Sequence, residues 1–155
     1  MTRIGVLSDT HNHLDPRIPG LFAGVDHILH AGDIGLPAII LQLEQVASVT
    51  AVLGNTDDPG FGYRQSEVVE AAGRRFLVQH IVDPQSPADP IKERTVRERL
   101  NVVVFGHTHK RFCQTLGGVL FFNPGYAGKS RFGLARSVAI LHCSEEGIRG
   151  EYLEL

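Results

Sequence analysis

The stretch RIGVLSDTH, residues 3–11, decides the fold class, because a short apolar run ends abruptly in polar residues. The run Arg3–Leu7 is typical of a buried strand, and Ser8–His11 is typical of the loop that follows one. The stretch DHILHAGD, residues 26–33, repeats this pattern, and Val49–Leu53 ends in Gly54 and Asn55 in the same way. We therefore predict three buried strands that each end in a polar loop.

Two segments between these strands have helical character. Pro16–Gly24 predicts a short helix. Leu36–Val46 carries apolar residues at helical spacing, with Pro37 in a position that suits the first turn. The alternation of strand and helix predicts a parallel sheet with right-handed crossovers.

The second half of the chain has a different pattern, dominated by strand pairs with tight turns. The predicted pairs are Glu67–Ala71 with Arg75–His80, Phe112–Leu116 with Val119–Phe122, and Ser137–Cys143 with Ile148–Leu153. Between them, Pro84–Pro90 predicts a loop, Ile91–Leu100 a helix and Val102–Phe105 a buried strand. The predicted fold class is therefore α/β, with two packed mixed β-sheets flanked by helices in a single domain over residues 1–155.

The composition is that of a soluble globular protein, with 43% hydrophobic and 21% charged residues. The net charge of −2 gives no electrostatic case for a protein that binds duplex nucleic acid, although a local basic patch is compatible with it. Cys113 and Cys143 lie far apart and lack a metal-binding spacing, which fits a reducing compartment. The N-terminus turns polar too early for a signal peptide, and no apolar run approaches the roughly 18 residues of a membrane helix. We expect a cytoplasmic protein with no membrane partner.

Residue types that bind metals follow the predicted strands. They are Asp9, His11, Asp33, Asn55, His80, His107 and His109. Because the loops beyond the carboxyl ends of parallel strands converge on one edge of a sheet, these seven side chains could meet. Imidazole and carboxylate groups suit divalent ions such as Mn, Zn, Fe or Ni, and one carboxylate can bridge two ions. Gly32, Gly54 and Gly106 lie beside these residues and would let the backbone approach closely.

The ordered motifs SDTH (8–11), HAGD (30–33), GNTD (54–57), a later His80 and FGHTH (105–109) carry a family resemblance. Together they resemble the calcineurin-like metallophosphoesterases, and among these the compact bacterial and archaeal phosphodiesterase branch. The resemblance extends from Arg3 to Gly125. It implies a sandwich of two mixed sheets and two divalent ions, with Mn first and Zn, Fe or Ni as alternatives.

The resemblance also implies a role for each matching residue. One metal would be held by Asp9, His11, His109 and a bridging Asp33, and the second by Asp33, Asn55, His80 and His107. Hydroxide between the metals would attack the phosphorus of a small phosphodiester substrate. Asp33, Asn55 and His107 would act in catalysis through the metals and through positioning of the phosphate. His30 would be a buried partner that orients the site rather than a ligand.

The chain departs from the family pattern at three positions. Thr56 stands where many relatives place a histidine that can protonate the leaving group, so no general acid is identified. Ile81 replaces the usual glycine after His80, and Tyr126 replaces the usual serine after the NPG motif. These three positions therefore bear on the leaving group and on the shape of the pocket.

Two other functions compete with this one. His11 and His13 form an HxH motif like that of TatD-type deoxyribonucleases, but such a barrel needs about 250 residues. Some metallophosphoesterase folds, such as a retromer subunit, instead serve as non-catalytic protein-binding scaffolds. A homo-oligomer is a further hypothesis, because Phe121 and Phe122 in Val119–Phe122 could form an exposed apolar edge for self-association.

Overall fold

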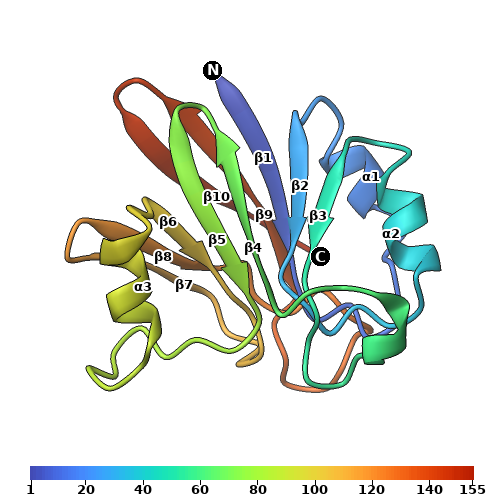
Figure 1. Ribbon diagram of the computed structural model, residues 1–155. Coiled ribbons are helices and arrows are strands. Elements are labelled where there is room, and N and C mark those ends of the chain that lie inside the picture. The colour runs from blue at the N-terminus through green and yellow to red at the C-terminus, as the bar shows by residue number, and fades with distance from the viewer.

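The computed structural model describes residues 1–155 and contains two mixed five-stranded sheets (Figure 1). The strands of the first sheet are β1 (Thr2–Leu7), β2 (His27–His30), β3 (Val49–Ala51), β9 (Ser137–Ser144) and β10 (Gly147–Glu154), in the order β10-β9-β1-β2-β3. Those of the second are β4 (Ser66–Ala71), β5 (Arg74–Gln79), β6 (Val102–Val104), β7 (Phe112–Leu116) and β8 (Val119–Asn123), in the order β4-β5-β6-β8-β7. Strands β1, β2 and β3 are parallel, as are β5, β6 and β8, and all three predicted hairpins are present.

The hydrophobic residues form three clusters that define the layers of the fold. The largest lies between the sheets and joins residues such as Val6 and Leu29 of the first sheet to Phe76 and Val104 of the second. A second cluster lies under α1 (Ile18–Leu21) and α2 (Ala38–Leu43), and a third under α3 (Ile91–Arg97). Figure 1 shows α1 and α2 on one side of the paired sheets and α3 on the other. The predicted sandwich of two mixed sheets flanked by helices is confirmed.

The helices are shorter than the sequence pattern predicts. The segment Pro16–Gly24 contains only the four-residue α1, because Pro19 and Gly20 lie inside it and neither supports a longer helix. A short 3-10 helix, η1 (Pro59–Phe61), was not predicted. None of the helices is long and apolar enough to cross a bilayer.

The prediction that Phe121 and Phe122 form an exposed apolar edge is wrong. Strand β8 lies inside its sheet, between β6 and β7, and both of its faces are covered. Because neighbouring residues of a strand point to opposite faces, Phe122 enters the cluster between the sheets and Phe121 enters the cluster under α3. Both rings are buried, so they present no surface to a second copy of the chain.

The parallel strands place one set of loops at a common edge. The loops that follow β1, β2, β3, β5 and β6 leave the carboxyl ends of these strands, away from the N-terminus in Figure 1. Apart from His30, which is the last residue of β2, the glycine and polar residues of the quoted motifs lie on these loops. The sandwich thus brings loops from both sheets together.

A buried ion pair ties the loop after β1 to the start of β9. The Asp15 carboxylate accepts hydrogen bonds from Arg17 and from Arg136, at 2.8 Å and 3.1 Å from Oδ2, and Asp15 is buried. The hydrogen bonds from Arg17 chiefly hold the Asp15 pKa well below its usual range, although burial opposes this, and Arg136 adds to the lowering.

Replacing Asp15 with asparagine is expected to lower the free energy of unfolding at pH 7 by about 1–2 kcal/mol. The Asp15 pKa is low in the folded protein and about 3.9 in an unfolded chain. The ion pair therefore stabilises the fold fully above about pH 5, and its contribution falls as the pH drops further. Urea unfolding between pH 7 and pH 3 should show the two proteins converging in stability. Glu145→Gln, at an exposed carboxylate, is the control, and an Asp15→Asn protein whose deficit is as large at pH 3 as at pH 7 would contradict this account.

Candidate metal centre

The structure brings all seven predicted site residues to the edge where the loops from the two sheets meet. Each predicted strand delivers its polar residue to this edge, with the loops after β1, β2, β3, β5 and β6 supplying them in turn. The residues are Asp9, His11, Asp33, Asn55, His80, His107 and His109. Asp9, Asp33 and His80 are buried, and the other four are partly or fully exposed, so the site has a buried floor and an open rim.

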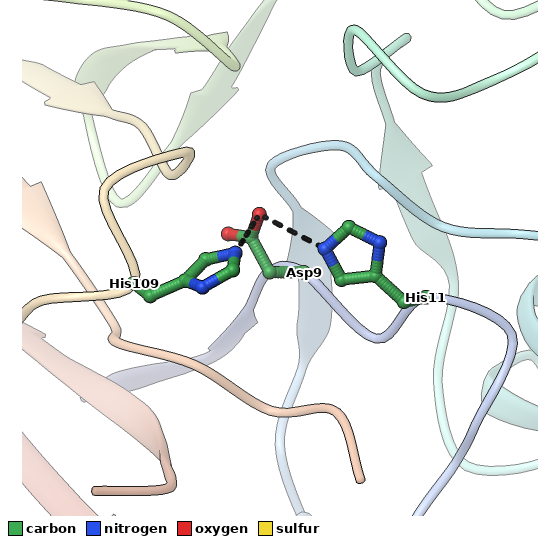
Figure 2. A group of neighbouring side chains, drawn as sticks. All are labelled: Asp9, His11 and His109. Carbon is green, nitrogen blue, oxygen red and sulfur yellow. Dashed lines mark ion pairs between the residues drawn. The ribbon is translucent and has the colours of Figure 1, made fainter. Parts of the chain in front are cut away.

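The first group of donor atoms consists of one carboxylate and two imidazoles. Nε2 of His109 lies 3.3 Å from Oδ1 of Asp9, and Nε2 of His11 lies 3.7 Å from the same oxygen. Figure 2 shows the two imidazoles on either side of the Asp9 carboxylate, carried by loops that are far apart in the sequence. Their ligand atoms lie within 4.8 Å of one another, a spacing that could hold one ion.

The second group of donor atoms shares Asp9 and adds Asp33 and His80. Nε2 of His80 lies 3.2 Å from Oδ2 of Asp33 and 3.9 Å from Oδ1 of Asp9. Oδ2 of Asp33 also lies 3.6 Å from Nε2 of His11. Asp33 therefore lies between the two groups, where a bridging carboxylate would be, and Asp9 contacts both groups as well.

Asn55 and His107 lie at the rim, outside these two groups. Nδ1 of His107 is 3.0 Å from Oδ1 of Asn55, within hydrogen-bonding distance. The His107 ring also meets the His80 ring edge-on, with 5.3 Å between centroids. Asn55 and His107, which are predicted ligands of the second metal, are thus neighbours. Both are exposed, whereas the residues of the floor are buried.

Each buried carboxylate has one oxygen held by the protein and one directed into the site. Oδ2 of Asp9 accepts hydrogen bonds from the Ser8 hydroxyl at 2.7 Å and from the backbone N–H of His107 at 3.1 Å. Oδ1 of Asp33 accepts one from the backbone N–H of Thr56 at 2.9 Å. Fixing one oxygen sets the orientation of the other, which is how outer residues position metal ligands.

Three buried polar atoms in this site have no hydrogen-bond partner. They are Oδ1 of Asp9, Nε2 of His11 and Nε2 of His80. Burial of an unpaired polar atom costs free energy, so such atoms are rare in folded proteins. For His80 the cause is visible, because Nδ1 contacts the carbonyl of Ala31 at 2.7 Å and must donate to it. The Nε2 lone pair is then directed into the site. A divalent cation would satisfy all three atoms, so these residues fit a metal.

The pKa values of the two carboxyls are lowered. Burial by itself raises both values, but the local contacts outweigh it. The His80 imidazole and the Thr56 backbone N–H hold the pKa of Asp33 well below its usual range, and His11 contributes most to the lowering at Asp9. Both carboxylates are therefore charged at neutral pH, as ligands of a cation must be.

The pKa values of two site histidines move in opposite directions. For His80, burial lowers the pKa, but the neighbouring Asp33 and Asp9 raise it above its ordinary value overall. For His109, burial is the largest influence and the pKa falls. The negative charge of Asp9 and Asp33 thus raises the pKa of His80 more than that of His109.

The backbone at the site is in an unusual conformation. Five of the predicted ligands have positive φ angles, a region that residues other than glycine rarely adopt. They are Asp9 (60°), His11 (44°), Asp33 (54°), His107 (72°) and His109 (62°). Strained backbone of this kind concentrates at functional sites, where the surrounding structure holds it in place.

Two glycines allow the loops to pack this closely. A Cβ atom at Gly54 would lie 2.1 Å from the backbone nitrogen of Asp33, and one at Gly106 would lie 2.0 Å from the Ser8 hydroxyl oxygen. Neither contact is possible, so any side chain at these positions would displace a buried carboxylate or the hydroxyl that holds one. The predicted role of these glycines in close backbone approach is confirmed.

Two residues that tie the site loops together are not predicted from the sequence. The Asp57 carboxylate accepts hydrogen bonds from the backbone N–H groups of Ile34, Gly35 and Gly54, and so joins the loops after β2 and β3. The Asn123 amide donates to the carbonyl of Gly106 at 3.1 Å. Both residues belong to motifs that were noticed, GNTD and NPG, but nothing in a motif shows which loops its side chains join.

Other predicted positions have clear roles in the structure. His30 is fully buried, and Nε2 of its ring lies 3.0 Å from the Thr10 hydroxyl, so it supports the loop that carries Asp9 and His11. Burial lowers its pKa to about 4, which keeps it neutral. Tyr126 is also fully buried, with its ring 4.7 Å from that of His109. It therefore backs the site rather than forming an exposed pocket edge.

Comparison with known proteins gives consistent matches. The profile of the calcineurin-like phosphoesterase superfamily domain matches residues 2–146. A probable metallophosphoesterase of Methanothermobacter thermautotrophicus is 33% identical over 129 residues, which cover 79% of this chain and 75% of that protein. A phosphodiesterase of Methanocaldococcus jannaschii is 28% identical over 142 residues, which cover 79% and 82% respectively. The solved structure of an archaeal phosphodiesterase superimposes with a TM-score of 0.76 at 26% identity, over 98% of this chain and 100% of that one.

Proposed function

Because the chain belongs to the calcineurin-like phosphoesterase superfamily, we propose that it hydrolyses phosphodiesters with two divalent metal ions held at this edge. The choice of phosphodiesters over monoesters is supported by a similar protein and a similar solved structure that are each named as a phosphodiesterase. Manganese is the first candidate metal, with Zn, Fe or Ni as alternatives that suit the same imidazole and carboxylate donors. The substrate would be a small phosphoester.

The observation that carries this proposal is the set of unpartnered buried atoms. Oδ1 of Asp9, Nε2 of His11 and Nε2 of His80 all lie in one space, together with Oδ2 of Asp33. Two lowered carboxyl pKa values place two negative charges there. Without a cation, this arrangement of unpaired atoms and negative charges costs free energy.

The TatD-type alternative is wrong, because the fold is a two-sheet sandwich and His13 belongs to neither donor group.

The metals would supply Lewis acidity toward the phosphoryl oxygens and a hydroxide nucleophile at neutral pH. The chain itself would orient the reactants. Asp33 lies between the two donor groups and would set their separation, while Asn55 and His107 at the open rim are placed to position the phosphate. Thr56 offers no ionisable proton donor, so substrates with good leaving groups should react fastest.

The test is hydrolysis of bis-p-nitrophenyl phosphate by the purified protein with Mn²⁺, Ni²⁺ or Zn²⁺. Activity should require added metal, should disappear with EDTA and should return when metal is restored. Calorimetric titration of the metal-free protein should show two bound Mn²⁺ ions per chain. A metal-loaded protein that cleaves no member of a broad phosphoester panel would contradict the proposal and favour the scaffold alternative.

A further inference from the structure

A cavity with a partly apolar lining opens beside the metal centre on the His107 side. It has a volume of about 500 Å³, and its apolar lining residues are Ile81, Val82, Phe105 and Phe112. Val82 and Phe105 are buried and form its floor. Ile81 is 52% exposed, directly after the proposed ligand His80. We refer to this space as the Ile81 cavity.

The Ile81 cavity is continuous with the site. His107 lines it directly. Ile81 also lines a smaller hollow of about 260 Å³ that contains Asn55 and His80. The isoleucine therefore stands between two spaces that both contain proposed ligands of the second metal. A phosphorus atom held at this edge would have the cavity directly beside it.

The charged groups around the Ile81 cavity favour a ligand that bears a phosphate. Lys110 lies on its lining, and no carboxylate lies within 4 Å of its ammonium group. The two acidic residues that line the cavity, Asp83 and Asp89, accept hydrogen bonds from backbone N–H groups of their own loop. Asp83 accepts a hydrogen bond from the N–H of Gln85, and Asp89 accepts one from the N–H of Asp83. A negative charge at the cavity mouth would thus meet an unpaired cation.

The cavity on the other side of the centre has a different character. It has a volume of about 640 Å³, begins at His109 and is lined mostly by glycine and polar residues. One of its cations, Arg136, is bonded to Asp15 and to the carbonyl of Gly128. Its apolar lining residues are the aliphatic Leu134, Ala135 and Leu155, so an apolar group next to the phosphate would meet phenylalanine rings on the Ile81 side and not on this one.

We propose that the Ile81 cavity binds an aromatic or aliphatic ester arm of the substrate, so that the protein prefers phosphodiesters with one apolar arm. This rests on the proposed function, because it assumes that the phosphate is held at the metal centre. The volume lies within the range of small-molecule sites, roughly 300–1,000 Å³. Each buried methylene is worth about fourfold in affinity, so an aromatic arm should be distinguished clearly from a methyl group.

The test compares phenylphosphonate with methylphosphonate, which place the same anion at the metals with a large or a small apolar group. Dissociation constants are measured by calorimetry on the Mn²⁺-loaded protein and checked by competitive inhibition of diester hydrolysis. The wild-type protein should bind phenylphosphonate at least about tenfold more tightly. Ile81→Gly should reduce this preference about fivefold or more and leave the affinity for methylphosphonate unchanged. Ile81→Leu, the matched control, should retain the preference.

Other outcomes would overturn the proposal. Equal affinities of the wild-type protein for the two phosphonates would show that the cavity contributes nothing, even if diesters are hydrolysed. An Ile81→Gly protein that loses affinity for both phosphonates equally would show that Ile81 acts only by supporting His80. A wild-type protein that neither binds two metals nor cleaves diesters would refute the proposed function itself, and the inference would fall with it.

Discussion

Replacing Asp33 with alanine is expected to lower kcat/KM for bis-p-nitrophenyl phosphate by about a thousandfold or more. Oδ2 of Asp33 lies 3.2 Å from Nε2 of His80 and 3.6 Å from Nε2 of His11, so it is close to an imidazole of each metal set and nearer to His80 than Oδ1 of Asp9, which is 3.9 Å away. Its loss would remove a negative charge from the place where two cations would be closest together. Steady-state kinetics at saturating Mn²⁺ measure the effect.

A matched variant separates this role from a general loss of charge or stability. Asp58 is an exposed carboxylate that caps η1 through the N–H of Gly60 and belongs to neither donor group. Asp58→Ala should keep kcat/KM within about twofold of the wild type. Circular dichroism should show that both variants are folded. An Asp33→Ala protein with more than a tenth of the wild-type activity would exclude a bridging role.

Replacing His107 or His109 with alanine is expected to weaken a different metal in each case. Nε2 of His109 is 3.3 Å from Oδ1 of Asp9, in the group with His11. His107 instead contacts Asn55 and packs on His80. Each substitution should lower the affinity for one Mn²⁺ ion by at least about a hundredfold and leave the other bound. Calorimetric titration gives both affinities and the stoichiometry.

Double substitutions make this assignment sharper. His11→Ala and His109→Ala would act on the same ion, so together they should remove little more binding than either alone. His107→Ala combined with His109→Ala should remove both ions. If the His107→Ala and His109→Ala proteins lose the same ion, or if each loses both, the division of the two histidines between two metals is wrong.

The sequence predicted the fold well because its apolar runs are short and end in polar loops. The runs at residues 3–7 and 26–31 became β1 and β2, and the three glycine-containing turns became hairpins. The helices were predicted too long, because periodicity marks the buried face but not the turn at which a helix stops. Phe121 and Phe122 were misplaced because a sequence does not show that both faces of a strand will be covered.

The site was predicted as a set of residues but not as an arrangement. Loops at the ends of parallel strands converge, so the meeting of Asp9, Asp33 and His80 followed from strand order. That Asp9 contacts both donor groups depends on which oxygen Ser8 and the N–H of His107 hold, and this is a property of three loops packed together. No spacing in the sequence encodes such a contact.

The left-handed backbone at the proposed ligands has a consequence for how this protein could change over time. Each of the five strained residues raises the free energy of the fold by something of the order of 1 kcal/mol, and glycine would remove that strain at any of them. A lineage that still needs metal cannot accept the change, because glycine offers no donor atom. A lineage freed from catalysis can accept glycine at His11 or His109 and relieve this strain, whereas Asp9 and Asp33 accept hydrogen bonds that hold the loops. Loss of these metal ligands can therefore relieve backbone strain while the sandwich fold is kept.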